Sequence, residues 1–200
     1  MSLTAEARST RSERLDRLPF TRAHGRLAIP PSLLARERLM HDLLRVAPGR
    51  VAFYGLENQA GTPVYVHAKV CVIDDEWASV GSDNFNRRSW THDSELTAAV
   101  WHQSYARSLR ATLAAEHLGL DSSTASALTM PQMYDAFAAA AADLQRWRDR
   151  GGVGPRPAGQ VRPLERQELG PITRAWASPL YRVVYDPDGR PLGLRLRRAM

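Results

Sequence analysis

The residue types best suited to chemistry in this 200-residue chain lie between Val64 and Val100. His67 and Lys69 interrupt the β-branched run that begins at Val64. Side chains two residues apart on a strand share one face, so the sequence predicts that His67 and Lys69 project together while Ala68 faces away. A group that titrates near neutral pH would then lie beside a fixed cation.

A turn of small residues should bring further polar groups to the same place. The apolar run 77–80 ends at Gly-Ser-Asp-Asn, residues 81–84, whose amides and side chains can donate hydrogen bonds to an anion. A hairpin would return Ser82 and Asn84 towards the imidazole and the ammonium group. Glu95 precedes a third apolar run and adds a carboxylate at a strand edge.

These positions follow the spacing His67-x-Lys69-x4-Asp74-x6-Gly81-Ser82-x-Asn84, with Glu95 further on. The pattern resembles the HKD motif of the phospholipase D superfamily, which includes phospholipases D, cardiolipin and phosphatidylserine synthases and some nucleases. The flanking sequence, from about Gly25 to the YDPDG segment near the end, is similar to the C-terminal half of actinobacterial cardiolipin synthase-like or phospholipase D-like proteins. The resemblance implies an α/β fold in which a mixed sheet is flanked by helices, as in one lobe, complete or truncated, of a phospholipase D fold.

The resemblance also implies a reaction, namely phosphodiester cleavage with transfer to an acceptor. In that superfamily one histidine attacks phosphorus to form a phosphohistidine, and a second histidine, from another copy of the motif, acts as general acid. The motif here is similar to the second copy, which assigns His67 to the general acid and later base, with the nucleophile as the alternative. Glu95 would orient the His67 ring, as a carboxylate orients histidine in other triads.

The other motif positions receive phosphate-binding or structural roles from the same resemblance. Lys69 and Asn84, helped by Ser82, would bind the non-bridging oxygens and stabilise the charge that develops on them. Asp74 and Gly81 would be structural. The resemblance implies no cofactor, and because no Cys/His cluster has zinc spacing, a metal is not implied either.

A single His-x-Lys pair is present, although the reaction needs two histidines at one phosphorus. A homodimer mate or a missing N-terminal half would have to supply the second HKD motif. Three functions therefore stay open: a cardiolipin synthase-like hydrolase or phosphatidyltransferase, a dimeric HKD nuclease, and an inactive half-enzyme fragment.

Charge is distributed unevenly along the chain. Residues 1–50 and 151–200 each carry five more basic than acidic residues, whereas residues 51–150 carry 8 Lys and Arg against 12 Asp and Glu. The acidic middle makes nucleic acid a less favoured partner than a phospholipid or another phosphodiester, because a nucleic-acid groove needs a continuous basic track. No apolar run is long enough to cross a bilayer and no signal sequence is present, so the sequence predicts a cytoplasmic location or peripheral membrane contact.

The sequence further predicts how the chain is divided. Residues 1–24 are expected to be disordered or weakly helical, and residues 25–150 to form the phospholipase D-like domain, with its core motif at about 61–95. A Pro/Gly/Arg linker over 151–171 and a C-terminal docking segment with a basic tail over 172–200 would follow. The expected elements of one central sheet are strands near 51–54, 64–74, 77–81 and 95–101, with helices at 33–47, 103–118 and 131–149.

Overall fold

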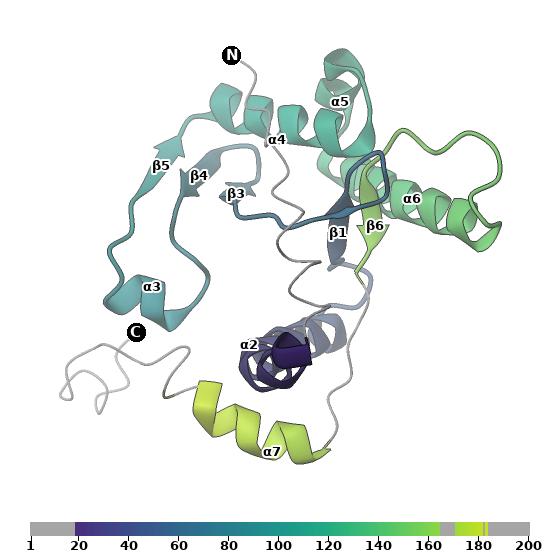
Figure 1. Ribbon diagram of the computed structural model, residues 1–200. Coiled ribbons are helices and arrows are strands. Elements are labelled where there is room, and N and C mark those ends of the chain that lie inside the picture. The colour runs from purple at the N-terminus through teal and green to yellow at the C-terminus, as the bar shows by residue number, and fades with distance from the viewer. Residues whose placement is uncertain (1–18, 165–170, 182, 184–200) are drawn as a thin grey trace. The chain divides into compact units, whose positions relative to one another are not determined.

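The computed structural model describes residues 19–164, 171–181 and 183 of the chain. They form two units, one containing residues 52–84 and 95–165 and the other containing helices α2, α3 and α7. The described chain contains helices and short antiparallel strands, which Figure 1 labels in chain order. The α/β class expected from the sequence is confirmed.

The first sheet of the larger unit holds the central part of the motif. Strands β3 (Lys69–Ile73), β4 (Trp77–Gly81) and β5 (Thr97–Trp101) form an antiparallel sheet in the order β3-β4-β5. Helix α4 (Gln103–Leu118) packs against all three strands. Ala78 of β4 lies opposite Val72 and Val100 and is fully buried, which identifies the face that α4 covers. Lys69 belongs to the alternate set of residues and therefore to the opposite face.

The second sheet is also three-stranded and antiparallel. Its order is β2-β1-β6, with β1 at Tyr54–Glu57, β2 at Pro63–Val64 and β6 at Val161–Pro163. The single central sheet that the sequence predicts is thus divided, because β2 pairs with β1 while β3 pairs with β4. A β-branched run indicates an extended backbone but does not identify the strand that will pair with it.

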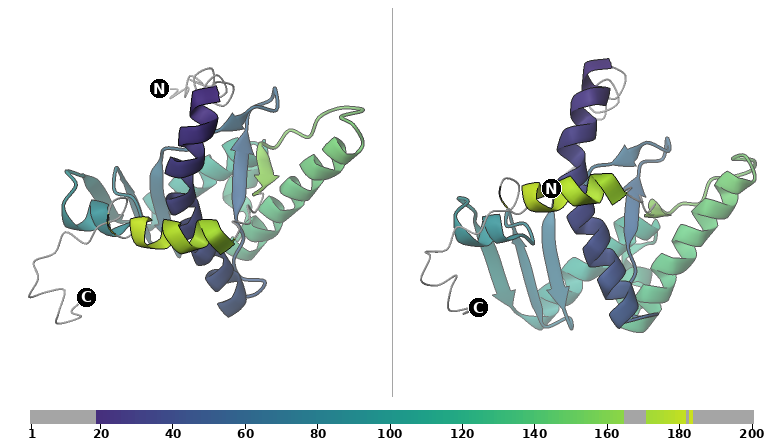
Figure 2. Two further views of the ribbon diagram at one scale, coloured as in Figure 1. Left: turned by 60° about the horizontal axis from the view of Figure 1, so that its bottom comes forward. Right: turned by 90° about the horizontal axis from the view of Figure 1, so that it is seen from below.

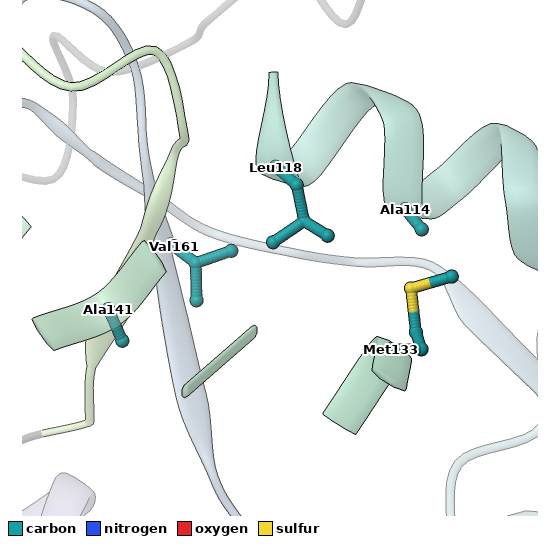
Figure 3. Close-up of a cluster of buried hydrophobic side chains, with 5 residues drawn as sticks. All are labelled: Ala114, Leu118, Met133, Ala141 and Val161. Atoms are coloured by element: carbon teal, nitrogen blue, oxygen red, sulfur yellow. The ribbon is translucent and has the colours of Figure 1, made fainter. Parts of the chain in front are cut away.

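Helices pack against the second sheet to form the core of this unit. Helix α6 (Met130–Asp149) begins with a capping box between Thr129 and Gln132, and the short α5 (Ser122–Ala127) precedes it. Figure 3 shows the buried cluster, which comes from α4, α6 and β6 and consists of Ala114, Leu118, Met133, Ala141 and Val161.

Strand β6 lies within the range for which the sequence predicts a linker. Val161 is fully buried and lies opposite Leu56 of β1, so this segment completes the sheet and the core at once. The strand has only three residues and is surrounded by glycine and proline, so it has no alternation long enough to recognise in the sequence.

The smaller unit contains α2 (Pro19–Val46), α3 (Arg87–Thr91) and α7 (Pro171–Leu180). Both views in Figure 2 show α7 crossing α2, and Arg38 donates a hydrogen bond of 3.1 Å to the Ser178 hydroxyl. The expected helix start after Pro30-Pro31 differs from the observed one, because α2 continues through both prolines. The expectations for residues 1–18 and for the basic tail from residue 184 onwards lie outside the described residues.

The turn between β3 and β4 is tied to helix α4 by an ion pair. Asp74 and Asp75 have φ of 53° and 58°, left-handed values that a tight antiparallel hairpin requires and that aspartate tolerates. Arg110 donates two hydrogen bonds to the Asp75 carboxylate, at 2.6 and 2.8 Å. The same hydrogen bonds hold the pKa of Asp75 below its ordinary value of 3.8, against a smaller opposite effect of burial.

Replacing Asp75 by asparagine should lower the free energy of unfolding at neutral pH by about 1.5–3 kcal/mol, because the buried Arg110 loses its charged partner. The pKa of Asp75 is lower in the folded chain than in the unfolded one, so this stabilisation is present above about pH 4 and is lost as the pH falls through the folded value. Urea unfolding at pH 7 and pH 3 should therefore show a smaller difference between the variant and the wild type at pH 3. Asp74→Asn, at the neighbouring exposed position, is the matched control, and an equal loss in both variants would contradict the assignment.

Candidate functional site

The structure brings the side chains of His67 and Lys69 together. Lys69 is the first residue of β3, whereas His67 lies just before the strand and is exposed. The Lys69 Nζ lies 3.0 Å from the His67 Nε2 and donates a second hydrogen bond of 3.2 Å to the His67 carbonyl oxygen. An ammonium group can only donate, so Nε2 accepts and carries its lone pair in this arrangement.

The end of the sheet β3-β4-β5 assembles the other motif positions around this pair. Lys69 lies opposite Gly81, and Gly81 lies opposite Thr97. The start of β3, the end of β4 and the start of β5 therefore lie at the same end of the sheet. Ser82 links two of these segments. Its backbone N–H donates to the Leu96 carbonyl at 3.0 Å, and its hydroxyl accepts from the Leu96 N–H at 3.0 Å.

Gly81 is required because β5 passes close to it. A Cβ at position 81 would lie 2.5 Å from Thr97 Cα and 2.6 Å from the Leu96 carbonyl oxygen, which no side chain can accommodate without moving the backbone. The absence of a side chain thus allows Ser82 to reach Leu96.

Gly81→Ala should reduce the free energy of unfolding by about 1–3 kcal/mol, because the methyl group must push β5 away from β4. Chemical denaturation of the purified chain measures this. Gly159→Ala is the control, since a Cβ there meets its neighbours at 3.4 Å or more, the ordinary van der Waals range. A loss at Gly159 as large as that at Gly81 would show that close approach of β5 is not the cause.

The remaining site positions are distributed between the two ends of this sheet. Asn84 and Glu95 lie in the segments that leave β4 and enter β5, on the same end as Lys69. Asp74 is exposed in the turn at the opposite end, which is consistent with no direct contact to the His67–Lys69 pair. The catalytic and phosphate-binding roles of these residues stay predictions.

A buried carboxylate, which the sequence analysis did not identify, supports the hairpin that leads to His67. Glu57, at the end of β1, is fully buried between Arg148 and Arg156, and the Arg156 Nη2 donates to its Oε1 at 2.9 Å. Arg156 also donates to the Gln59 side chain at 2.7 Å. These contacts fix the loop between β1 and β2, from which the chain continues to His67. Only the three-dimensional pairing of residues about a hundred positions apart reveals this support.

Neither a metal centre nor a membrane span is apparent in the described chain. Over residues 19–164, 171–181 and 183, no group of three or more His, Cys, Asp or Glu side chains could hold a metal ion. Within the same residues, no helix combines the length and the apolar character needed to cross a membrane.

The comparison with known proteins matches the motif region. The family described as "Cardiolipin synthase, PLD-like domain" matches residues 34–116. Cardiolipin synthase 2 of Staphylococcus epidermidis is 43% identical over 58 residues, which cover 26% of this chain and 12% of that protein. Cardiolipin synthase 1 of Staphylococcus aureus is 42% identical over 67 residues, covering 34% and 12%. Phospholipase D zeta 2 of Arabidopsis thaliana is 31% identical over 96 residues, covering 35% and 9%.

The chain therefore spans only about a tenth of the length of these relatives. No solved structure matches it. The matched segment contains all the motif positions from His67 to Glu95 together with the sheet that carries them. Residues 34–116 of this chain are thus similar to the PLD-like domain of cardiolipin synthases, and the matches to cardiolipin synthases and to a phospholipase D support a relationship to the phospholipase D superfamily.

Proposed function

We propose that the chain contributes one half of a phospholipase D-like active site that cleaves a phosphodiester and transfers the phosphatidyl group to an acceptor. The observation that carries the proposal is the contact of 3.0 Å between the Lys69 ammonium and the His67 imidazole, at the sheet end where Gly81 and Ser82 complete the motif. The match of residues 34–116 to a cardiolipin synthase domain supports a phospholipid as substrate.

Lys69 would act first, by binding the substrate anion. A phosphodiester repels nucleophiles until its charge is neutralised, and a phosphate oxygen is a stronger acceptor for an ammonium group than a neutral imidazole nitrogen. Substrate binding would draw Lys69 from Nε2 to the phosphate, and the Nε2 lone pair would become available for proton transfer or attack. Lys69 would thus contact His67 in the empty site and the phosphate in the occupied one.

Once released by Lys69, Nε2 would take up a proton from solvent, and His67 would then give that proton to the leaving oxygen as the phosphorus–oxygen bond breaks and a phosphorus–nitrogen bond forms to a second histidine. In the second half of the reaction it would take the proton from the acceptor hydroxyl, whose oxygen displaces the histidine nitrogen from phosphorus. The alternative assignment makes His67 the attacking histidine. Glu95 would orient the ring through Nδ1 in either case.

Ser82 and Asn84 would bind the non-bridging oxygens together with Lys69. The Ser82 hydroxyl already accepts from the Leu96 N–H, and its own donor contact to the Leu96 carbonyl is long, at 3.5 Å. It can therefore turn its proton to a phosphate oxygen while keeping the stronger of the two bonds.

The proposal needs a second His-x-Lys pair, so activity should depend on assembly. Fractions from size-exclusion chromatography, assayed with phosphatidylglycerol and with single-stranded DNA, test this directly. We expect the 200-residue chain by itself to elute as a monomer with little or no turnover. A monomer with high specific activity would refute the need for two histidines, an active dimer would locate both of them in copies of this chain, and cleavage of DNA alone would favour a nuclease.

A further inference from the structure

Lys69 is the only lysine in the 200-residue chain, and its side-chain nitrogen lies against a base. The ammonium group donates to the His67 Nε2 at 3.0 Å and to the His67 carbonyl oxygen at 3.2 Å. These two contacts turn the side chain back along the chain and hold the nitrogen beside the imidazole lone pair. Because His67 is exposed and Lys69 is half-buried at the end of the sheet, a small molecule can reach this nitrogen from solvent.

The same geometry meets the main requirement for a reactive lysine. An ammonium group has no lone pair, so a lysine attacks a carbonyl carbon only after it has given a proton to a base. For Lys69 that base is in place, because Nε2 already accepts its hydrogen bond. The Tyr65 ring stacks on the imidazole, with ring centroids 5.9 Å apart and planes 24° from parallel, which favours this orientation of the His67 ring.

The charge around the pair decides which kind of electrophile is favoured. The half-buried carboxylates of Asp83 and Glu95 lie in the segments that leave β4 and enter β5, at the same end of the sheet as Lys69. Two carboxylates against one lysine disfavour a doubly charged acyl donor such as an acyl phosphate. A thioester carries no charge at its reacting carbonyl, so its approach does not depend on the net charge of this sheet end.

We propose that Lys69 is a modification site, acylated by a thioester with His67 as the base, and that the acyl group switches the site off. A proton of the ammonium group passes to Nε2, the nitrogen attacks the thioester carbonyl, and a carbon–nitrogen bond replaces the carbon–sulfur bond. Of the two protons that the nitrogen loses, one reaches the leaving sulfur through His67 and the other goes to solvent. The product is a neutral amide, so the pair loses its positive charge. The loss of turnover rests on the proposed function, whereas the acylation itself does not.

Peptide mapping measures the reaction at one residue without requiring turnover. The purified 200-residue chain is incubated with the acetyl thioester of N-acetylcysteamine, digested with trypsin and analysed by mass spectrometry. Trypsin cleaves after Lys69 only while its amine is free, so acylation replaces two peptides by one that runs from residue 51 to residue 87.

Arg107→Lys places a second lysine in the same chain as an internal comparison. Position 107 is more exposed than Lys69, so accessibility alone would favour acylation there. The Arg107 side chain donates to the Ser126 carbonyl oxygen, which is no base for an ammonium group.

Two variants of His67 separate the base from the hydrogen bond. His67→Ala removes both, whereas in His67→Gln the amide oxygen can accept from the ammonium group but cannot take its proton. Circular dichroism checks that both variants fold.

We expect Lys69 to be acylated at least about tenfold faster than the lysine introduced at position 107, and about tenfold or more slowly in both His67 variants than in the wild type. Equal rates at the two lysines, or an unchanged rate in His67→Gln, would overturn the proposal. So would an assembled enzyme that keeps its phosphodiester turnover when Lys69 is fully acylated. If acylation behaves as expected but the unmodified assembly has no turnover, the proposed function fails and the modification site stands.

Discussion

Replacing His67 with alanine should lower phosphodiester turnover by at least about a hundredfold, because general acid–base catalysis contributes about 10²–10⁴ and a nucleophile contributes more. The expectation applies to the active assembly, with kcat measured under saturating substrate. His41→Ala, at an exposed position on α2, should leave kcat unchanged. Near wild-type turnover by the His67 variant would remove the basis of the proposed mechanism.

The leaving group can separate the two roles open to His67. A p-nitrophenolate leaves without being protonated, whereas the alkoxide of a natural diester does not. If His67 is only the general acid, the variant should retain much more activity on a p-nitrophenyl diester than on a phospholipid. If it attacks phosphorus, or if two copies of this chain supply both histidines, both activities should be lost together.

Lys69→Arg should also lower kcat/KM, by about tenfold or more, although the charge is preserved. The ammonium group is a compact donor that contacts both the His67 ring and the His67 carbonyl, at 3.0 and 3.2 Å. The planar fork of a guanidinium group is wider and cannot occupy the same place. Steady-state kinetics on a soluble phosphodiester measures the effect, with Arg107→Lys on α4 as the reciprocal control.

The composition of the chain allows anion binding at Lys69 to be measured directly. This residue is the only lysine among 200 residues, so reductive ¹³C-methylation yields a single side-chain signal besides that of the chain terminus. Titration with inorganic phosphate or vanadate should shift that signal if the ammonium group moves to an anion. A signal that does not respond at saturating anion, together with an active Lys69→Arg variant, would show that the lysine is incidental.

Local sequence signals predicted some elements well. Strand β4 matches the expected residues 77–81, and α4 matches 103–118, because a glycine ends each of them. The helix expected at 131–149 begins at Met130, within one residue of the prediction, and Pro131 lies in its first turn. The residues that start or end these elements lie next to them in the chain, so a single sequence is enough to predict where the elements begin and end.

Contacts between segments distant in the chain could not be predicted from local sequence signals. The division of the strands between two sheets, the use of Val161 as a strand residue and the burial of Glu57 between two arginines all depend on partners distant in the chain. For the site, the spacing of the motif predicted that His67 and Lys69 meet, and they do, although His67 lies just outside the strand. The stacking of the exposed Tyr65 ring on His67 had no sequence signal.

The pairing of β1 with β6 has a consequence for the order in which the chain folds. Leu56 of β1 can pair with β6 only after Val161, about a hundred residues later in the chain, is present. Strands β3, β4 and β5, in contrast, are joined by short connections. Because closing a long loop slows folding, the sheet that carries Lys69 can form during synthesis before the core that surrounds Val161. Pulsed hydrogen exchange during refolding should therefore protect the amides of β4 before those of β1.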